Sequence, residues 1–163
     1  AGGLQMEGRY LTLDPEVKDG VFSYYTDEGL ITSRSYYRVG KKYKPSVYYN
    51  ASGELDAKLY DPDFMENMPE FPGGIPKLLE YLSSKLVYPK EAQKNGIQGT
   101  VFVRFVVSEK GVVEEVSVVN SLHPAIDQEA MRVVKQMPKW KPGKFEGRAV
   151  SVWYTLPIRF TLS

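Results

Sequence analysis

Few side chains in this sequence of 163 residues have the types and spacing that catalysis or metal binding requires. His123 is the only histidine and there is no cysteine, so the residues of a histidine–cysteine metal site are absent. No Gly-x-Ser-x-Gly motif is present, and Gly143-Lys144 lacks the preceding glycines of a phosphate-binding loop. Acidic pairs such as Asp61 with Asp63 fall in expected turns, where they are typical of solvated charge. These residues predict a protein that binds and does not catalyse, without cofactor or metal, in which His123 caps a helix or lies on the surface.

The balance of charge narrows the class of partner. The 21 basic and 20 acidic side chains are interspersed, and the formal net charge is +1. Nucleic-acid binding usually needs a concentrated basic face, so we expect no nucleic-acid partner. No apolar run reaches the roughly 18 residues of a transmembrane helix, and no signal peptide is visible. We interpret Ala1-Gly2-Gly3 as a cloning scar, with any upstream anchor or export signal outside the given sequence.

The first part of the chain, residues 1–63, is rich in tyrosine and glycine and contains a repeat. Tyr24-Tyr25 followed by Gly29 returns as Tyr48-Tyr49 followed by Gly53, a shift of 24 positions in both cases. Aromatic residues favour strands, and regularly spaced glycines favour tight turns. The pattern predicts a β-meander of two to four short strands.

The second part, residues 64–163, alternates helical and strand patterns. Three prolines and two glycines between Asp61 and Gly74 break regular structure and mark the boundary between the two parts. After Pro76, leucines at helical spacing predict one apolar helix face: Leu78, Leu79, Leu82 and Leu86. The remaining pattern predicts a short helix, two strands joined by a turn, a long amphipathic helix and a final strand, at residues 89–96, 100–108, 112–118, 124–137 and 148–162. This order predicts an α+β fold, a two-layer sandwich of a three-stranded antiparallel sheet with helices on one face.

The final strand has the cleanest alternation in the chain. Apolar side chains occupy every second position from 150 to 162, with mostly polar side chains between them. Pro157 lies inside this strand and has no N–H to donate, and prolines within sheets are confined to edges and bulges. We therefore expect this strand at the edge of the sheet, where its backbone can pair with an added strand.

The order of landmarks from Tyr88-Pro89 onward resembles the C-terminal domain of TonB, and most closely the Bacteroidetes-type energy transducer. Gly99 precedes the first strand, Gly111 lies between the strands, His123-Pro124 begins the helix, and Trp140-Lys141-Pro142-Gly143 precedes the last strand. The resemblance covers roughly residues 71–163 and implies a TonB-like C-terminal domain over residues 64–163. The tyrosine–glycine region before it resembles MORN-type repeats.

The resemblance implies a function as well as a fold. In the TonB family, the extended TonB box of an outer-membrane transporter pairs with the final strand. The implied partner-binding residues are Tyr88, Pro89, Arg148, Ala149, Val150, Ser151, Val152, Trp153, Tyr154 and Thr155. The resemblance also implies a periplasmic location, an inner-membrane anchor upstream of this sequence, and inner-membrane proton-channel proteins whose proton motive force the protein couples to uptake. Family members carry a Gln-rich stretch where this chain has Leu86-Val87, so we expect side-chain recognition to differ.

Two further readings of the same fold stay open. A periplasmic adaptor would bind peptidoglycan or another envelope protein, and the tyrosine-rich region would offer a surface for glycan. An exposed edge strand would also permit a strand-exchanged homodimer. A transmembrane helix and proline-rich spacer upstream of Ala1 would favour the transducer, whereas a lipoprotein signal or a cleaved signal would favour the adaptor.

Overall fold

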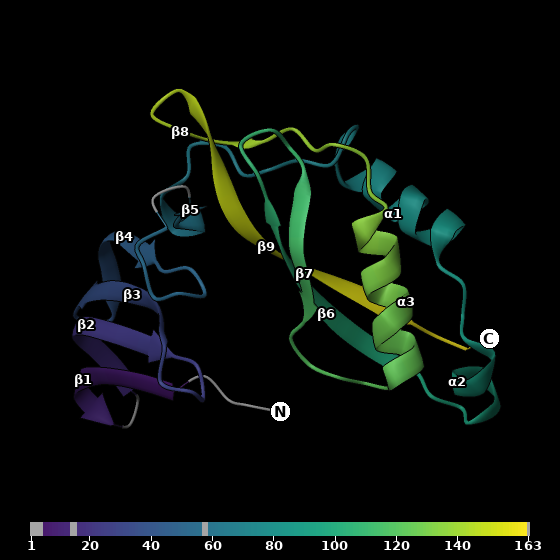
Figure 1. Cartoon of the computed structure of the whole chain (residues 1–163), viewed down its shortest axis with the longest axis horizontal. Coiled ribbons are helices and arrows are strands. Elements are labelled where there is room, and N and C mark those ends of the chain that lie inside the picture. The colour runs from purple at the N-terminus through teal and green to yellow at the C-terminus, as the bar shows by residue number, and fades with distance from the viewer. Residues whose placement is uncertain (1–4, 14–15, 57–58, 163) are drawn as a thin grey trace. The chain divides into compact units, whose positions relative to one another are not determined.

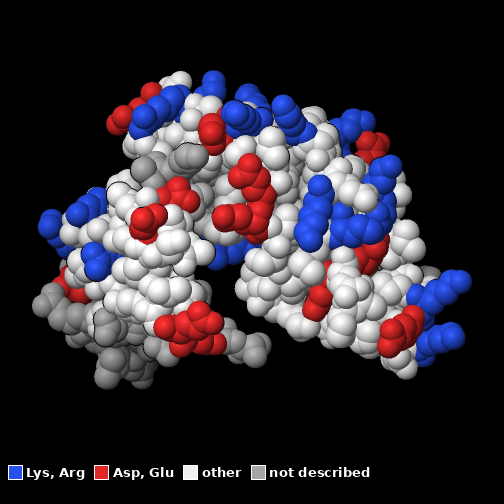
Figure 2. All heavy atoms as spheres, viewed as in Figure 1, with Lys and Arg blue, Asp and Glu red and all other residues white. Residues whose placement is uncertain are grey.

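The computed structural model describes residues 5–13, 16–56 and 59–162, and it forms two compact units, Ala1–Met65 and Glu66–Ser163. Figure 1 shows the sheet of each unit, and Figure 2 shows basic and acidic side chains interspersed on the face viewed. The first unit contains a meander whose strands pair antiparallel in chain order: β1 (Gln5–Leu13), β2 (Glu16–Tyr25), β3 (Ile31–Arg38) and β4 (Lys41–Tyr48). The short strand β5 (Leu59–Tyr60) and the 3-10 helix η1 (Pro62–Phe64) follow.

The sequence repeat in this unit corresponds to a repeated turn. In the first copy, Gly29 donates its N–H to Thr26 O at 2.9 Å, and Thr26 donates to Leu30 O at 2.8 Å. In the second copy the same two bonds recur, from Gly53 to Asn50 O at 2.9 Å and from Asn50 to Glu54 O at 2.8 Å. Both glycines have positive φ, 81° and 77°, which glycine adopts without steric cost. The 24-residue repeat therefore encodes one turn geometry used twice.

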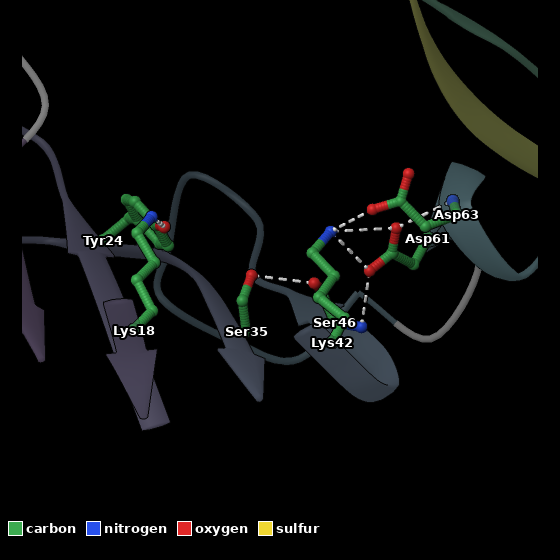
Figure 3. A network of polar contacts seen from close by, with 7 residues as sticks. All are labelled: Lys18, Tyr24, Ser35, Lys42, Ser46, Asp61 and Asp63. Carbon is green, nitrogen blue, oxygen red and sulfur yellow. Dashed lines mark hydrogen bonds and ion pairs between the residues drawn. The ribbon is translucent and has the colours of Figure 1, made fainter. Parts of the chain in front are cut away.

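A buried carboxylate holds η1 against β4 in the first unit (Figure 3). The Asp61 side chain is 1% exposed and accepts the Ser46 N–H at 2.8 Å, the Asp63 N–H at 3.1 Å and Lys42 Nζ at 3.0 Å. Lys42 Nζ also contacts the exposed Asp63 carboxylate at 2.8 Å. Burial alone would raise the pKa of Asp61, but the hydrogen bonds from Ser46, Lys42 and Asp63 outweigh it and lower the pKa.

This carboxylate predicts acid sensitivity of the first unit. Because the folded-state pKa of Asp61 is lowered, its stabilisation is complete above the unfolded-state value of about 4 and is lost as the pH falls through the folded-state value. We expect Asp61→Asn to lower the free energy of unfolding by about 1–3 kcal/mol at neutral pH and to flatten its decline in acid. Amide hydrogen exchange of β4 between about pH 6 and about pH 3 measures both effects.

Asp63→Asn is the matched control, because Asp63 contacts the same lysine but its side chain is 64% exposed. An exposed ion pair contributes at most about 1 kcal/mol, so this variant should keep the acid dependence of the natural chain. Equal flattening in both variants would show that the burial of Asp61 does not matter.

The second unit confirms the α+β fold expected from the sequence. Within this unit β9 pairs antiparallel with β6, β6 pairs antiparallel with β7, and β8 pairs with the start of β9. Helices α1 and α3 bury their apolar residues in one core with a face of this sheet. The elements are α1 (Gly74–Lys85), α2 (Lys90–Lys94), β6 (Gly99–Val107), β7 (Val113–Val118), α3 (Pro124–Lys135), β8 (Gly143–Phe145) and β9 (Arg148–Phe160).

The period-two and helical patterns place the core residues largely as expected. The inward residues of β6, and the stripe along α3, are fully buried: Val101, Val103, Phe105, Val107, Ile126, Ala130, Val133 and Val134. On α1, Leu78 and Leu82 are buried, but Leu79 is 60% exposed. The buried face of α1 is therefore narrower than the sequence predicted and does not include Leu79. That residue follows Leu78 directly and lies about 100° further round the helix.

His123 is the N-cap of α3, as one of the sequence-based alternatives expected. Its Nδ1 accepts the Ala125 N–H at 3.2 Å, which satisfies a donor in the first helical turn. Further along α3, Glu129 accepts the Val87 N–H at 2.9 Å, and Arg132 donates to Lys85 O at 3.0 Å. Arg132 and the Val87 N–H thereby lower the pKa of Glu129, although burial opposes them. These contacts attach the segment between α1 and α2 to α3.

Trp140 is the centre of an aromatic cluster between the core and the final strand. Its side chain is 3% exposed, and its ring lies 5.7 Å from Phe71, 5.6 Å from Phe105 and 5.0 Å from Tyr154, measured between centroids. The Trp140 backbone passes directly over Gly111, whose carbonyl accepts the Trp140 N–H at 2.8 Å. A Cβ added to Gly111 would lie 2.0 Å from Trp140 O, so only glycine fits at this crossing.

Candidate partner-binding edge

The final strand β9 pairs with β6 in an unbroken register from Gly99↔Phe160 to Val107↔Val152. The hydrogen bonds of Phe102 show which residues of β6 direct their backbone N–H and C=O groups toward β9. Its N–H donates to Asn120 Oδ1 and its C=O accepts the Val119 N–H, both at 2.9 Å, so both groups point to the β7 side. In an antiparallel pair, the residue opposite such a position also directs its backbone groups away from the shared ladder. Pro157, the partner of Phe102, therefore has its nitrogen and carbonyl on the outer side of β9.

This direction explains how a proline fits within a long strand. Since the nitrogen of Pro157 points away from β6, the missing N–H removes no hydrogen bond from the β6 ladder. Residues an even number of positions away share the orientation, so Trp153, Thr155 and Arg159 also direct their N–H and C=O groups outward. Val152 and Tyr154, by contrast, bond to β6. Trp153 and Thr155 are thus the two residues of the expected 148–155 segment whose backbone groups point outward beyond β8.

The first three residues of β9 differ from the expectation of an open edge. A hairpin turn folds β8 back onto them, pairing Gly143↔Val150, Lys144↔Ala149 and Phe145↔Arg148. The two turn residues, Glu146 and Gly147, both have positive φ, 49° and 74°, as a tight hairpin of this kind requires. The sequence-based expectation that Arg148, Ala149 and Val150 form an open edge is therefore wrong, because the chain already covers it.

Ser151 and its neighbours also differ from the expected strict alternation. Val150, Ser151 and Val152 are all buried, at 5%, 5% and 0% exposure. The Ser151 hydroxyl donates to Glu109 Oε2 at 2.7 Å and accepts the Glu109 N–H at 3.2 Å. Near the start of β9, residues 148 and 150 direct their backbone groups toward β8. After Ser151, the first residue whose backbone groups point away from β6 is Trp153. The side chain of Ser151 holds the β6–β7 turn and is not displayed to a partner.

Tyr88 and Pro89 lie at the opposite end of β9 from residues 148–155. The Tyr88 ring packs edge-on against Phe160 with centroids 5.7 Å apart, and its hydroxyl donates to Ile97 O. Pro89 is the N-cap residue of α2. These two residues therefore seat α2 on the end of β9, and the structure does not bring them together with the rest of the expected site.

The face of the sheet away from the helices carries a residue group that sequence reasoning did not single out. Arg104 Cζ lies 3.9 Å from the centroid of the Trp153 ring, a close cation–π contact across the β6–β9 ladder. Phe102 on the same strand is 41% exposed. The register, which places Arg104 opposite Thr155 and two pairs from Trp153, was needed to find this diagonal contact.

The described residues offer little that is typical of a catalytic or metal site. Within residues 5–13, 16–56 and 59–162, no group of three or more histidine, cysteine, aspartate or glutamate side chains could hold a metal ion. Burial raises the pKa of Tyr154, so its hydroxyl stays protonated at physiological pH. In the described part of the chain, no helix has both the length and the apolar character needed to cross a bilayer.

The second unit is a two-layer α+β fold whose longest strand, β9, pairs with β6 along most of its length and with β8 over its first three residues. A family model described as the Gram-negative bacterial TonB protein C-terminal matches residues 84–162. Through this segment the chain belongs to the TonB C-terminal family, a non-catalytic interaction module of the cell envelope whose members interact with outer-membrane TonB-dependent receptors.

The chain is also similar to two solution structures of the Helicobacter pylori TonB C-terminal domain. The first is 28% identical, with 54% of this chain and 79% of that chain covered and a TM-score of 0.42. The second is 30% identical, with 53% of this chain and 90% of that chain covered and a TM-score of 0.41. A search of curated proteins gives no match.

Proposed function

We propose that this protein is a periplasmic energy-transducer module that binds the TonB box of an outer-membrane transporter by adding it as a strand to β9. The observation that carries the proposal is the outward orientation of the Trp153 and Thr155 backbone groups in a chain of the TonB C-terminal family. An extended peptide would pair with these groups, beyond the three residues of β9 that pair with β8. Residues Arg148 to Val150 would then influence binding through the hairpin and not through their own ladder.

The energetics of strand addition suit a link that must form and release. A net hydrogen bond contributes only about 0.5–1.5 kcal/mol, and Trp153 and Thr155 together offer two donors and two acceptors. Affinity should therefore be modest and should depend little on the side chains of the peptide. For coupling to the inner membrane, we propose an anchor upstream of Ala1 that contacts proton-channel proteins.

A proline scan of β9 tests this pairing. Trp153→Pro and Thr155→Pro each remove an outward N–H without removing a bond to β6, so we expect them to weaken peptide binding by roughly three- to tenfold. Trp153→Ala and Thr155→Ala retain the N–H and are the side-chain controls. The measurement is amide chemical-shift mapping of the intact chain during titration with N-terminal peptides of transporters.

Pro157→Ala is the complementary control, because it adds a backbone N–H that points away from β6, whereas the proline variants remove one. We expect this variant to bind at least as tightly as the natural chain. Shift changes confined to residues before Asp61, or equal losses in the proline and alanine variants, would contradict pairing along β9.

An adaptor that binds peptidoglycan or another envelope protein is the second candidate. The feature in its favour is a tyrosine-rich first unit that the transporter-binding proposal does not use. Binding of the intact chain to envelope components, without response to any transporter peptide, would support the adaptor over the transducer.

A further inference from the structure

One face of the β3–β4 hairpin carries a patch of alternating cations and tyrosines. Lys44 Nζ lies 3.9 Å from the centroid of the Tyr36 ring, Arg38 Cζ lies 5.0 Å from Tyr43, and Arg34 Cζ lies 5.9 Å from Tyr49. The Tyr36 and Tyr43 rings contact each other edge-on with centroids 6.4 Å apart. We call this group the basic tyrosine patch: Arg34, Tyr36, Arg38, Tyr43, Lys44 and Tyr49.

The patch is accessible and positively charged. All three of its cations are exposed, and the Tyr43 side chain is 48% exposed. Residues 31–49 contain five basic residues and no acidic residue. Figure 2 shows basic side chains gathered over the β3–β4 hairpin, at the left of the view. The hairpin is thus a local cationic region in a chain whose formal net charge is only +1.

The cations of the patch are positioned without being neutralised. Within the described part of the chain, neither Arg34, Arg38 nor Lys44 makes an ion pair with a carboxylate. Their contacts are with tyrosine rings, which orient a cation but leave its full charge available to an anion. On the opposite face of the same sheet, Lys42 is paired with Asp61 and Asp63, so its charge is already used.

This chemistry fits an anionic glycan better than other polyanions. Tyrosine presents a flat ring and a hydroxyl, which suit the apolar face and the hydroxyl groups of a sugar ring. An arginine fork binds a carboxylate in bidentate geometry. Membrane binding usually requires several aliphatic or indole side chains that insert beside the cations, whereas the aromatic residues of the patch are tyrosines and the exposed aliphatic side chain beside it is the single Val39 at the turn.

We propose that the basic tyrosine patch binds peptidoglycan, with tyrosines contacting the sugar rings and Arg34, Arg38 and Lys44 contacting the carboxylates of the peptide stems. The envelope location of the TonB C-terminal family places such a glycan within reach. The patch lies in the first unit, whereas the residues proposed to pair with a transporter peptide lie in the second.

Co-sedimentation of the intact chain with purified Gram-negative sacculi tests the proposal. The patch variant combines Arg34→Gln, Arg38→Gln and Lys44→Gln, and we expect its apparent Kd to rise roughly tenfold, because each exposed charge contact is worth about two- to threefold. The control variant removes the same charge from exposed lysines of the second unit, by Lys90→Gln, Lys94→Gln and Lys139→Gln, and should bind like the natural chain. Raising NaCl from about 50 mM to about 300 mM should weaken binding of the natural chain and affect the patch variant less.

Three outcomes would overturn the proposal. They are no sedimentation of the natural chain, equal loss in the two triple variants, and binding to vesicles containing phosphatidylglycerol without binding to sacculi. If the patch variant does not fold, the single variants Arg38→Gln and Tyr43→Ser replace it, each with an expected loss of about two- to threefold. Full binding by both single variants would likewise overturn the proposal.

Discussion

Trp140→Ala should lower the free energy of unfolding of the second unit by about 3–5 kcal/mol. The side chain is 3% exposed and contacts the rings of Phe71, Phe105 and Tyr154, so its removal leaves a cavity enclosed by residues from three separate segments. The loss in free energy of unfolding is partly offset, because the substitution also removes an unsatisfied hydrogen-bond donor. The indole Nε1–H is buried and finds no hydrogen-bond partner among the described residues, and an unsatisfied donor costs about 1–3 kcal/mol.

Two substitutions separate the cavity from the unsatisfied donor. Trp140→Phe removes the N–H while keeping most of the ring volume, and it should cost no more than about half as much as Trp140→Ala. Trp153→Ala removes the other tryptophan, which is only half-buried, and should cost about 1–2 kcal/mol. Urea denaturation followed by circular dichroism measures all three. A Trp140→Ala variant as stable as the natural chain would contradict the packing described above.

Gly111→Ala should be about as damaging as loss of the tryptophan. The added Cβ would lie 2.0 Å from the Trp140 carbonyl oxygen, and that neighbour is backbone, which cannot rotate away. Gly111 also has a φ of 80°, where a residue with a Cβ costs about 1–2 kcal/mol. With overlap of about 1–3 kcal/mol added, we expect a loss of about 2–5 kcal/mol and displacement of the segment before β8.

Gly147→Ala is the matched control for this prediction. Gly147 has a similar φ of 74°, but an added Cβ would meet no atom within 4 Å. It should therefore lose only the conformational contribution of about 1–2 kcal/mol. Thermal denaturation of both variants measures the two losses of stability. Equal losses would show that the close approach of the Trp140 backbone to Gly111 adds no further cost.

Sequence periodicity was sufficient for most of the fold. The alternation along residues 101–107 and the stripe on α3 predicted which side chains are buried, because a single core faces both elements. The cap at His123 also followed from local sequence, since Pro124 marks the helix start. Leu79 shows the limit of this reasoning, because a leucine at helical spacing can still lie beyond the width of the contact surface.

The binding edge was less predictable, and the reason is non-local. Pro157 led to the prediction of an edge strand, but which backbone groups of β9 point away from β6 depends on the register between the two strands. The pairing of β8 with Arg148 to Val150 depends on a two-residue turn at Glu146-Gly147, where glycine supplies only the second positive φ. Glu146 is a non-glycine residue in this conformation, which sequence patterns rarely mark.

The β8–β9 hairpin limits the length of β9 that the proposed strand addition could use. Beyond Ser151 the strand continues from Trp153 to Phe160, which corresponds to roughly 26 Å of extended backbone. At one end of this segment β8 pairs with Arg148 to Val150, and at the other end the strand stops at Phe160. Under the proposed strand addition, an added strand of about eight residues would match this length. In the proposed complex, the hairpin would set the residue at which a partner strand begins, before any side chain is recognised.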